Sequence, residues 1–289
     1  MAVVFALPAS AGPFACKVCH PNEVEGYSHY NMAHSLRQAG KEPVGSFENQ
    51  FGTKFTIYSD QSGTWQRLES AGGTFDYRVE YVIGSGKHAQ GYLVRIGDHL
   101  FQSPIAYYTA RHAYGMAPGF EKYADADFTR PIAVACLLCH SGKPLHKEGT
   151  IAGYETPAFA QEAILCERCH GPTEEHMKHP VPGSIVNPKK LQGAARDSVC
   201  EQCHLAGVVR IPNPGKSVEG FHPGMPLEDV FSVYVLPESA SSSLRVISQS
   251  EELRASACAR NSGGKLWCGT CHDPHNKPTS RSLIIAYAA

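Results

Sequence analysis

Five short stretches of this 289-residue chain carry the pattern Cys-x-x-Cys-His. Their cysteines are Cys16, Cys19, Cys136, Cys139, Cys166, Cys169, Cys200, Cys203, Cys268 and Cys271, and their histidines are His20, His140, His170, His204 and His272. A shuffled chain with 11 Cys and 15 His would contain about 0.02 such matches, so the repetition has a chemical cause. Two thiols and an imidazole at this spacing are the attachment set of a c-type haem.

Tetrahedral zinc is the alternative that this residue set leaves open. Structural zinc uses two Cys-x-x-Cys pairs, or one pair with a distant pair of histidines. All five pairs here are followed at once by histidine, which zinc does not require. Because one helical turn brings both thiols to a porphyrin edge and the imidazole to its face, we predict five covalently bound haem c groups.

The axial position opposite each proximal histidine decides what the iron can do. A second His or a Met closes that position for electron transfer, whereas an open position admits a substrate. Ten histidines lie outside the motifs, so ligands are plentiful: His29, His34, His88, His99, His112, His146, His176, His179, His222 and His275.

Three of these histidines have favourable sequence contexts. His176 follows Cys-His-Gly-Pro after the spacer Thr-Glu-Glu, and His275 comes three residues after a proximal histidine in CHDPH. His88 lies between glycines in IGSGKHAQGYL, which lets the backbone approach a flat ring. We predict that all three are axial ligands.

The other histidines are weaker candidates. His99, in a turn, and His179, in a Pro-rich loop, are expected to be exposed to solvent. His112, His146 and His222 remain possible ligands.

The segment after the first motif, CHPNEVEGYSHYNMAHS, offers Met32 or His34 as a ligand, with His29 third. Strong candidates thus number four for five irons. At most one haem is expected to be five-coordinate.

Composition and residue pattern indicate the elements that hold these sites. Five haems leave about 58 residues each, so porphyrins are expected to fill much of the core. The 27 Gly, the 20 Pro and the lack of a long 3.6-period stripe indicate sparse regular structure. We predict a mainly α and irregular multihaem cytochrome c fold, including a helix into CERCH that Thr156 caps and Pro157 begins.

Residues 45–105 differ in composition from the rest of the chain, because they contain β-branched and aromatic runs bounded by glycine. They predict a small antiparallel β insertion with a hairpin turn at Gly97-Asp98. The expected organisation is a signal-peptide remnant at 1–12, a first haem segment at 13–44, a β-rich insertion with an axial ligand at 45–131, a four-haem segment at 132–280 and a tail at 281–289.

Several features bear on location and partners. Haem c is attached outside the cytoplasmic membrane, and Ala9-Ser10-Ala11 resembles a signal-peptidase site, so a periplasmic or extracellular location is expected. The apolar run LIIAYAA is far shorter than the roughly 20 residues of a membrane span, so no transmembrane segment is expected. The net charge of −1 predicts no nucleic-acid partner. Cys258 is the one cysteine outside the motifs. It is expected to be a small partly buried residue, a haem contact or a reactive thiol.

Longer motifs carry a family resemblance over nearly the whole chain: CERCHGPTEEH, GSGKHA, FTRPI before CLLCH, IVNPKKL, VCEQCH, FHPGMPL and LWCGTCHDPH. Together they resemble exported multihaem cytochromes c related to the tetrahaem cytochrome that accepts electrons from hydroxylamine oxidoreductase. In many relatives, an aromatic residue seven positions after the first Cys-His and a ligand five positions further serve one axial site. Those positions are Tyr27 and Met32, so the resemblance favours Met32 over His34.

The sequence is compatible with three functions. The leading hypothesis is an electron-transfer protein that serves redox partners. The second is an enzyme acting on a small nitrogen or sulfur species at a five-coordinate haem, although resembling reductases use a Cys-x-x-Cys-Lys haem that this chain lacks. The third is a subunit of an extracellular cytochrome filament, in which the partner is a second copy of the chain.

Overall fold

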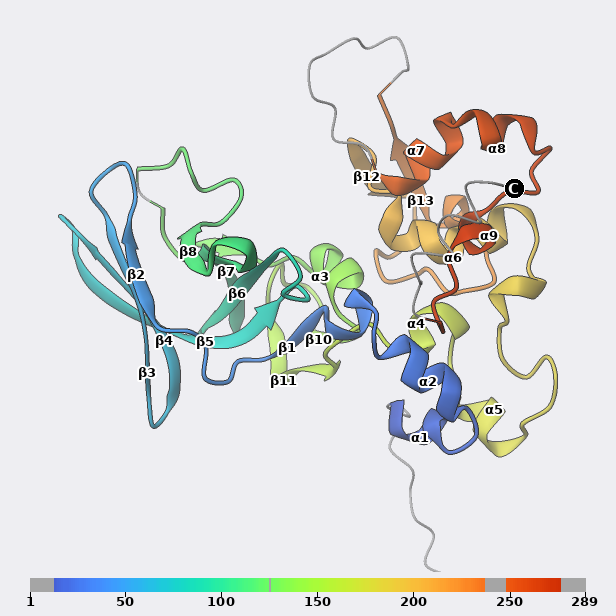
Figure 1. The fold of residues 1–289 in the computed structure, drawn as a ribbon, viewed down its shortest axis with the longest axis horizontal. Coiled ribbons are helices and arrows are strands. Elements are labelled where there is room, and N and C mark those ends of the chain that lie inside the picture. The colour runs from blue at the N-terminus through green and yellow to red at the C-terminus, as the bar shows by residue number, and fades with distance from the viewer. Residues whose placement is uncertain (1–12, 125, 237–247, 277–289) are drawn as a thin grey trace, which may run out of the picture. The chain divides into compact units, whose positions relative to one another are not determined.

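The computed structural model describes residues 13–124, 126–236 and 248–276. The chain divides into two compact units, Asn31–Ile164, called here the sheet unit, and Met1–Tyr30 with Leu165–Ala289, called the motif unit (Figure 1). The expected signal-peptide remnant at 1–12 and tail at 281–289 lie outside the described residues.

The sheet unit is built on one antiparallel sheet in the order β2-β3-β4-β5-β6-β7-β8, with β1 on β5 and β9 on β7. The strands are β1 (Leu36–Gln38), β2 (Gly45–Glu48), β3 (Lys54–Asp60), β4 (Gly63–Ser70), β5 (Gly73–Ile83), β6 (Ala89–Ile96), β7 (His99–Tyr108), β8 (Ala113–Met116) and β9 (Arg130–Pro131). Side chains of β3 and β4 alternate between buried and accessible, the period-2 pattern of a strand with one face inward. The predicted turn at Gly97-Asp98 is confirmed, because Ile96 pairs with His99 across it.

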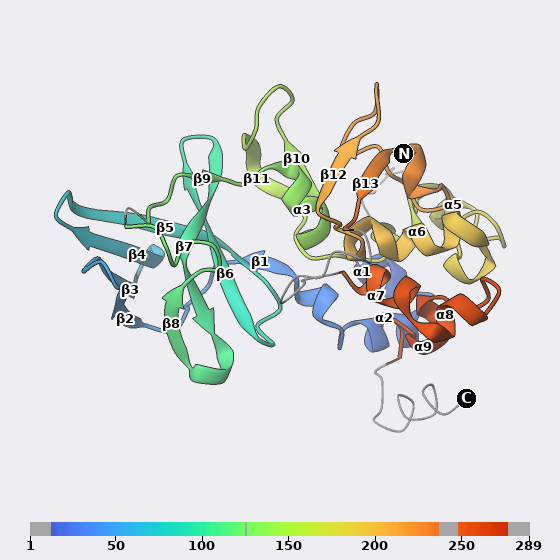
Figure 2. The same ribbon diagram turned by 90° about the horizontal axis from the view of Figure 1, so that it is seen from above.

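The sheet curls until its two ends meet. The hydroxyl of Tyr114 in β8 donates to the carbonyl of Pro43, which precedes β2, at 2.5 Å. A Cβ added at Gly45 would stand 3.1 Å from the Tyr114 ring. The sheet is therefore nearly closed (Figure 2).

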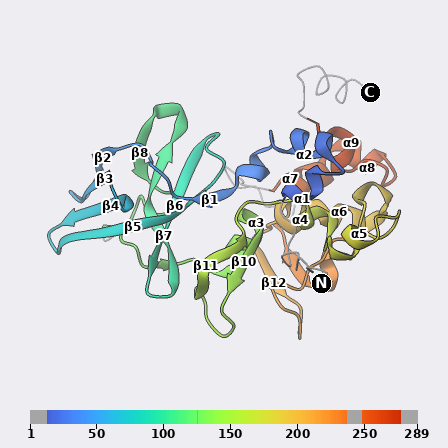
Figure 3. The same ribbon diagram turned by 90° about the horizontal axis from the view of Figure 1, so that it is seen from below.

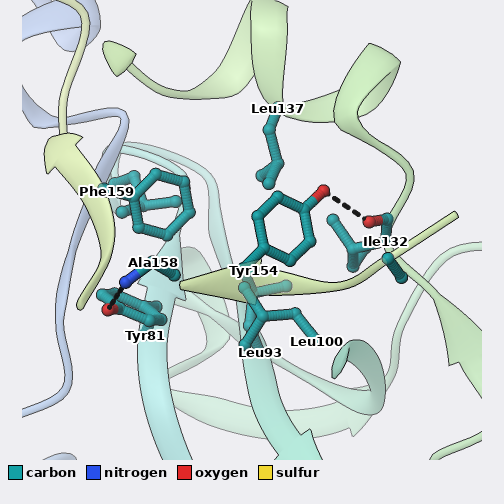
Figure 4. Packing of buried hydrophobic residues seen from close by; sticks show 10 residues of the cluster. Tyr81, Leu93, Leu100, Ile132, Leu137, Tyr154, Ala158 and Phe159 are labelled. Carbon is teal, nitrogen blue, oxygen red and sulfur yellow. Dashed lines mark hydrogen bonds between the residues drawn. The ribbon is translucent and has the colours of Figure 1, made fainter. Parts of the chain in front are cut away.

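A hairpin and a helix complete the sheet unit: β10 (Lys143–His146) pairs with β11 (Tyr154–Gln161), and α3 (Val134–His140) precedes them. Leu137 of α3 and Tyr154 of β11 are fully buried in one apolar cluster with Leu93 and Leu100 (Figure 4). The Tyr154 hydroxyl donates to the carbonyl of Ile132 at 2.7 Å, so the polar end of the ring is also satisfied.

The prediction of a mainly α fold is wrong. The protein is mostly antiparallel β, with 27% helix and 31% strand. The sheet extends past residues 45–105 on both sides, and the expected helix after Thr156 is instead strand β11. The physical reason is that this half of the chain builds its own core, with three clusters of buried apolar residues between the strands. Porphyrins are not needed to fill it.

The motif unit contains short helices and loops (Figure 3). Its elements are α1 (Pro13–Lys17), α2 (Pro21–Tyr27), α4 (Glu167–His170), α5 (Glu174–Lys178), α6 (Gly193–His204), α7 (Gln249–Ala255), α8 (Ala257–Asn261), α9 (Cys268–Cys271), β12 (Val209–Pro212) and β13 (Phe231–Tyr234). Short 3₁₀ turns add η1 (Asn31–His34) and η2 (Thr109–Arg111) in the sheet unit and η3 (Pro188–Lys190) and η4 (Leu227–Asp229) here. In the part of this unit that is described, one apolar cluster of five buried residues forms around β13.

Among residues 13–124, 126–236 and 248–276, no helix has the length and apolar character needed to cross a lipid bilayer.

Candidate haem sites

All five Cys-x-x-Cys-His motifs form, or lead into, a helical turn in α1, α3, α4, α6 and α9. In three of them the histidine amide donates to the carbonyl of the first cysteine, at 2.8 Å for His20, 2.9 Å for His170 and 2.9 Å for His272. Residues three and four apart share a face of such a turn. Both thiols and the imidazole of a motif thus lie on one side of the backbone.

The motifs are divided unequally between the two units. Four of them, beginning at Cys16, Cys166, Cys200 and Cys268, belong to the motif unit. The remaining motif, the second in chain order, begins at Cys136 and lies in α3 of the sheet unit. Its neighbour Leu137 anchors that turn in the apolar core.

His176 faces a proximal histidine from another motif. Its ring is roughly parallel to that of His20, with the centroids 6.3 Å apart and an interplanar angle of 23°. Two imidazoles that bind one metal through Nε2 at about 2.0–2.1 Å each hold their centroids roughly 6 Å apart. The Nδ1 atom of His176 is 2.8 Å from the hydroxyl of Ser184, which leaves Nε2 for a metal.

His275 stands in the same relation to His170. The ring centroids are 5.8 Å apart at 34°. Nδ1 of His170 lies 2.8 Å from the carbonyl oxygen of Val186, a partner that fixes the tautomer and frees Nε2. Burial lowers the pKa of His170, and the neighbouring imidazoles of His275, His20 and His176 lower it further. The neutral imidazole favoured here is the form that binds a metal.

Thiols of different motifs also meet. The Cys16 and Cys166 side chains are within hydrogen-bond reach of each other, and so are those of Cys200 and Cys268. In the motif unit, attachment points thus lie side by side in two pairs, the first motif with the third and the fourth with the fifth.

Tyr27, which the family resemblance singled out, lies among these attachment points. Burial raises the pKa of its phenol, and the nearby thiols of Cys169, Cys166 and Cys203 raise it further. Its ring stacks on Tyr30 with centroids 6.4 Å apart. The Tyr27 phenol is therefore close to cysteines of the third and fourth motifs.

Met32 and His34 lie in η1, directly before β1. Met32 is half-buried and His34 is exposed. The carbonyl of the next residue, Ser35, accepts from the Gly84 amide at 2.7 Å, and its hydroxyl accepts from the Ile164 amide at 3.1 Å. The structure therefore sets η1 beside the turn between β5 and β6.

His88 occupies that same turn and is exposed. Its carbonyl accepts from the amide of Thr109, the first residue of η2, at 3.0 Å. As far as the described residues go, its ring does not lie against a proximal histidine as those of His176 and His275 do. His140, the proximal histidine of the sheet unit, ends α3.

The weaker candidates are found in varied settings. Nε2 of His146 is 3.0 Å from the carbonyl of Thr150, and Nδ1 of His99 is 2.6 Å from Asp98. His99 is half-exposed, and the other members of the set are exposed at the surface: His29, His112, His179 and His222. Cys258 is an exposed thiol on α8.

Sequence reasoning missed the groups that orient the ligands. Ser184 and Val186 lie in a Pro-rich loop whose sequence carries no metal-binding signal. Only their distance in space to His176 and His170 reveals a role. A loop directly after a ligand-bearing helix is the one weak sequence signal that would have found them.

Comparison with known proteins comes from sequence and from fold. No family model matches the chain. It is 25% identical to the multihaem cytochrome MtrA of Shewanella baltica (strain OS185) over 179 residues, which are 56% of this chain and 52% of that protein. The chain thus spans about half the length of this curated relative.

Among solved structures, the outer cell wall cytochrome OcwA shares the fold with a TM-score of 0.56 at 17% identity, over 96% of this chain and 67% of that one. The undecahaem cytochrome from the S-layer of Carboxydothermus ferrireducens aligns with a TM-score of 0.47 at 17% identity, over 95% of this chain and 41% of its own. MtrA is named a multihaem cytochrome, and the sequence similarity to it supports the class that the motifs indicate, a multihaem c-type cytochrome.

Proposed function

We propose that this chain is an electron-transfer protein that carries five covalent haem c groups and passes single electrons between redox partners outside the cytoplasm. The observation that carries the proposal is the pair of facing imidazoles, His20 with His176 and His170 with His275. Two imidazoles on one iron occupy both axial positions, so no substrate reaches the metal. Sites of this kind serve electron transfer.

The chain's own groups prepare these ligand pairs. When bound, each haem supplies a one-electron couple. Ser184 and the Val186 carbonyl hold the Nδ1 sides of His176 and His170, which fixes the ring orientations. The side-by-side thiols of Cys16 and Cys166 bring two attachment edges together. Haem edges that lie close together favour electron transfer from one haem to the next.

Two further axial ligands are proposed from the residues of the sheet unit. We assign Met32 and His88 as axial ligands, with His34 as the alternative to Met32. The predicted division of the chain, with an axial ligand on the β-rich segment 45–131, is kept as part of the proposal. A relation to the acceptor of hydroxylamine oxidoreductase stays a prediction.

Location and partners follow from the chemistry and from the relatives. Haem c attachment requires export, and one structural relative is described as an outer cell wall cytochrome. We therefore place the chain in the periplasm or outside the cell, with other redox proteins as partners.

Met32 is expected to raise the potential of one haem, because thioether ligation favours the ferrous state relative to a second imidazole. Replacing Met32 by His should lower that potential by on the order of 0.1 V, a fraction of the roughly 0.8 V range that axial ligands span. The near-infrared sulfur-to-iron band of the oxidised protein should vanish at the same time. Spectroelectrochemical titration of both proteins makes the measurement. A wild-type protein without the band would make His34 or an open site the better assignment.

The carrier assignment is tested against enzyme function by ligand binding and turnover. We expect at most one of the five haems to bind carbon monoxide, and the dye-reduced protein should show negligible steady-state reduction of nitrite or hydroxylamine. Catalysis would need a positioned proton donor beside an open iron as well as the vacancy itself. Turnover of several per second, lost on blocking the open haem, would overturn the assignment.

A further inference from the structure

A glycine lies inside helix α2, where glycine is less favourable than alanine. The surroundings of Gly26 explain its presence. A Cβ added there would overlap the carbonyl oxygen of His275 and stand 2.5 Å from its carbonyl carbon. The backbone of α2 thus rests directly on the backbone of His275, and any larger residue would push the two apart.

Tyr30, three residues after the end of α2, contacts the loop that contains His275 at a second point. Its hydroxyl is within hydrogen-bond reach of the carbonyl oxygens of Asp273 and Asn276, the residues that flank His275. Inside the loop, the His275 amide donates to the Asp273 carboxylate at 3.0 Å, and the Asn276 side chain donates to it at 2.9 Å. The backbone contact from Gly26, and the Tyr30 hydroxyl with its one hydrogen shared between the two carbonyl oxygens, together hold the loop on both sides of His275.

The loop carries the imidazole that faces His170 at 5.8 Å. It follows the last turn of α9 and has no helix or strand of its own up to Asn276. Its geometry must therefore come from what it packs against, and α2 supplies the contacts described above. A shift of about 1 Å would take an imidazole nitrogen out of bonding range of a metal held at about 2.0–2.1 Å.

We propose that helix α2, through Gly26 and Tyr30, positions His275 as the distal ligand of the haem attached at Cys166 and Cys169. The inference rests on the proposed function, because it takes His170 and His275 as the ligands of one iron. Since α2 begins directly after His20, the segment that attaches the first haem also places a ligand of the third. The first and third haem sites are then joined by the seven residues of α2, so a displacement of the backbone at one site displaces the other.

The test compares holoprotein variants by carbon monoxide binding and by the low-spin signals in EPR. His275→Ala serves as the reference and should make one further haem bind carbon monoxide. Gly26→Ala should open that same haem in at least half of the molecules, and Tyr30→Phe should do so to a smaller extent. Gly40→Ala is the matched control, because a Cβ at Gly40 meets nothing within 4 Å, and it should match the wild type.

Each outcome decides one question. Wild-type ligation in Gly26→Ala overturns the role of α2, while a changed His275→Ala would still uphold the ligand pair. If His275→Ala alters no haem, the ligand assignment itself fails and the proposed function loses its main support. Should Gly26→Ala not mature, Tyr30→Phe decides, and a wild-type spectrum in that variant counts against the inference.

Discussion

Replacing His176 by alanine is expected to convert one low-spin haem into a haem that binds carbon monoxide, raising the number bound per protein by one. His176 faces His20 at 6.3 Å and is held at Nδ1 by Ser184. Alanine removes the sixth ligand and leaves space on that side of the iron. Titration with carbon monoxide, followed by optical and EPR spectra, measures the change.

His179→Ala is the matched control for this variant. His179 lies three residues further on, is exposed, and contacts only the exposed carboxylate of Glu175 at 3.9 Å among the contacts described for its side chain. Its removal should leave the spectra and the number of bound carbon monoxide molecules unchanged. Equal spectra for His176→Ala and the wild type would refute the assignment of His176.

A chain made without haem attachment is expected to keep the sheet unit folded and to lose the motif unit. The sheet unit has three apolar clusters that include fully buried Phe55, Leu93 and Tyr154. The motif unit has short helices and, in its described part, one small cluster around Phe231. Burial of apolar surface is the main stabilising term, so the two units should differ strongly without cofactor.

Hydrogen exchange of the cytoplasmically expressed apoprotein measures this difference. Strands β3 to β7 should show protection of about 10³ or more, which corresponds to a stability of at least roughly 4 kcal/mol at about 1.4 kcal/mol per factor of ten. Helices α4 to α9 should exchange close to the rate of an unfolded chain. Comparable protection in both units would show that the motif unit does not depend on its cofactors for a core.

The helical turns of the five motifs were easier to predict from the sequence than the fold was. The motifs and the two histidines after Cys-His-Gly-Pro and Cys-His-Asp-Pro could be read from local spacing, because one turn or a short loop fixes where these side chains point. The pairing of His176 with His20 could not, since 156 positions separate them and only the folded chain brings them together.

Strand β11 shows why the fold prediction was wrong. Thr156 and Pro157 read locally as a helix start, yet the segment pairs with β10 and buries Ala158 and Phe159 against Tyr81. Tertiary packing overrode a weak local preference, as it often does for helix propensity. The assumption that porphyrins must fill the core also hid the extent of the sheet, because a chain with five attachment motifs can still devote a whole unit to protein packing.

The role of Gly26 illustrates a second limit of sequence reasoning. A glycine in a seven-residue helix carries no functional signal by itself. Only its contact with the backbone of His275, 249 positions away, gives it one.

The mass of the intact protein, after export with the haem-maturation machinery, tests the central claim most directly. The account predicts a polypeptide heavier by five haem masses, with ten of the eleven cysteines blocked and only Cys258 free to react with a thiol reagent. A mass with fewer than five haems would show that some of the motifs do not attach haem. A protein carrying zinc with the motif thiols unmodified would contradict the account as a whole.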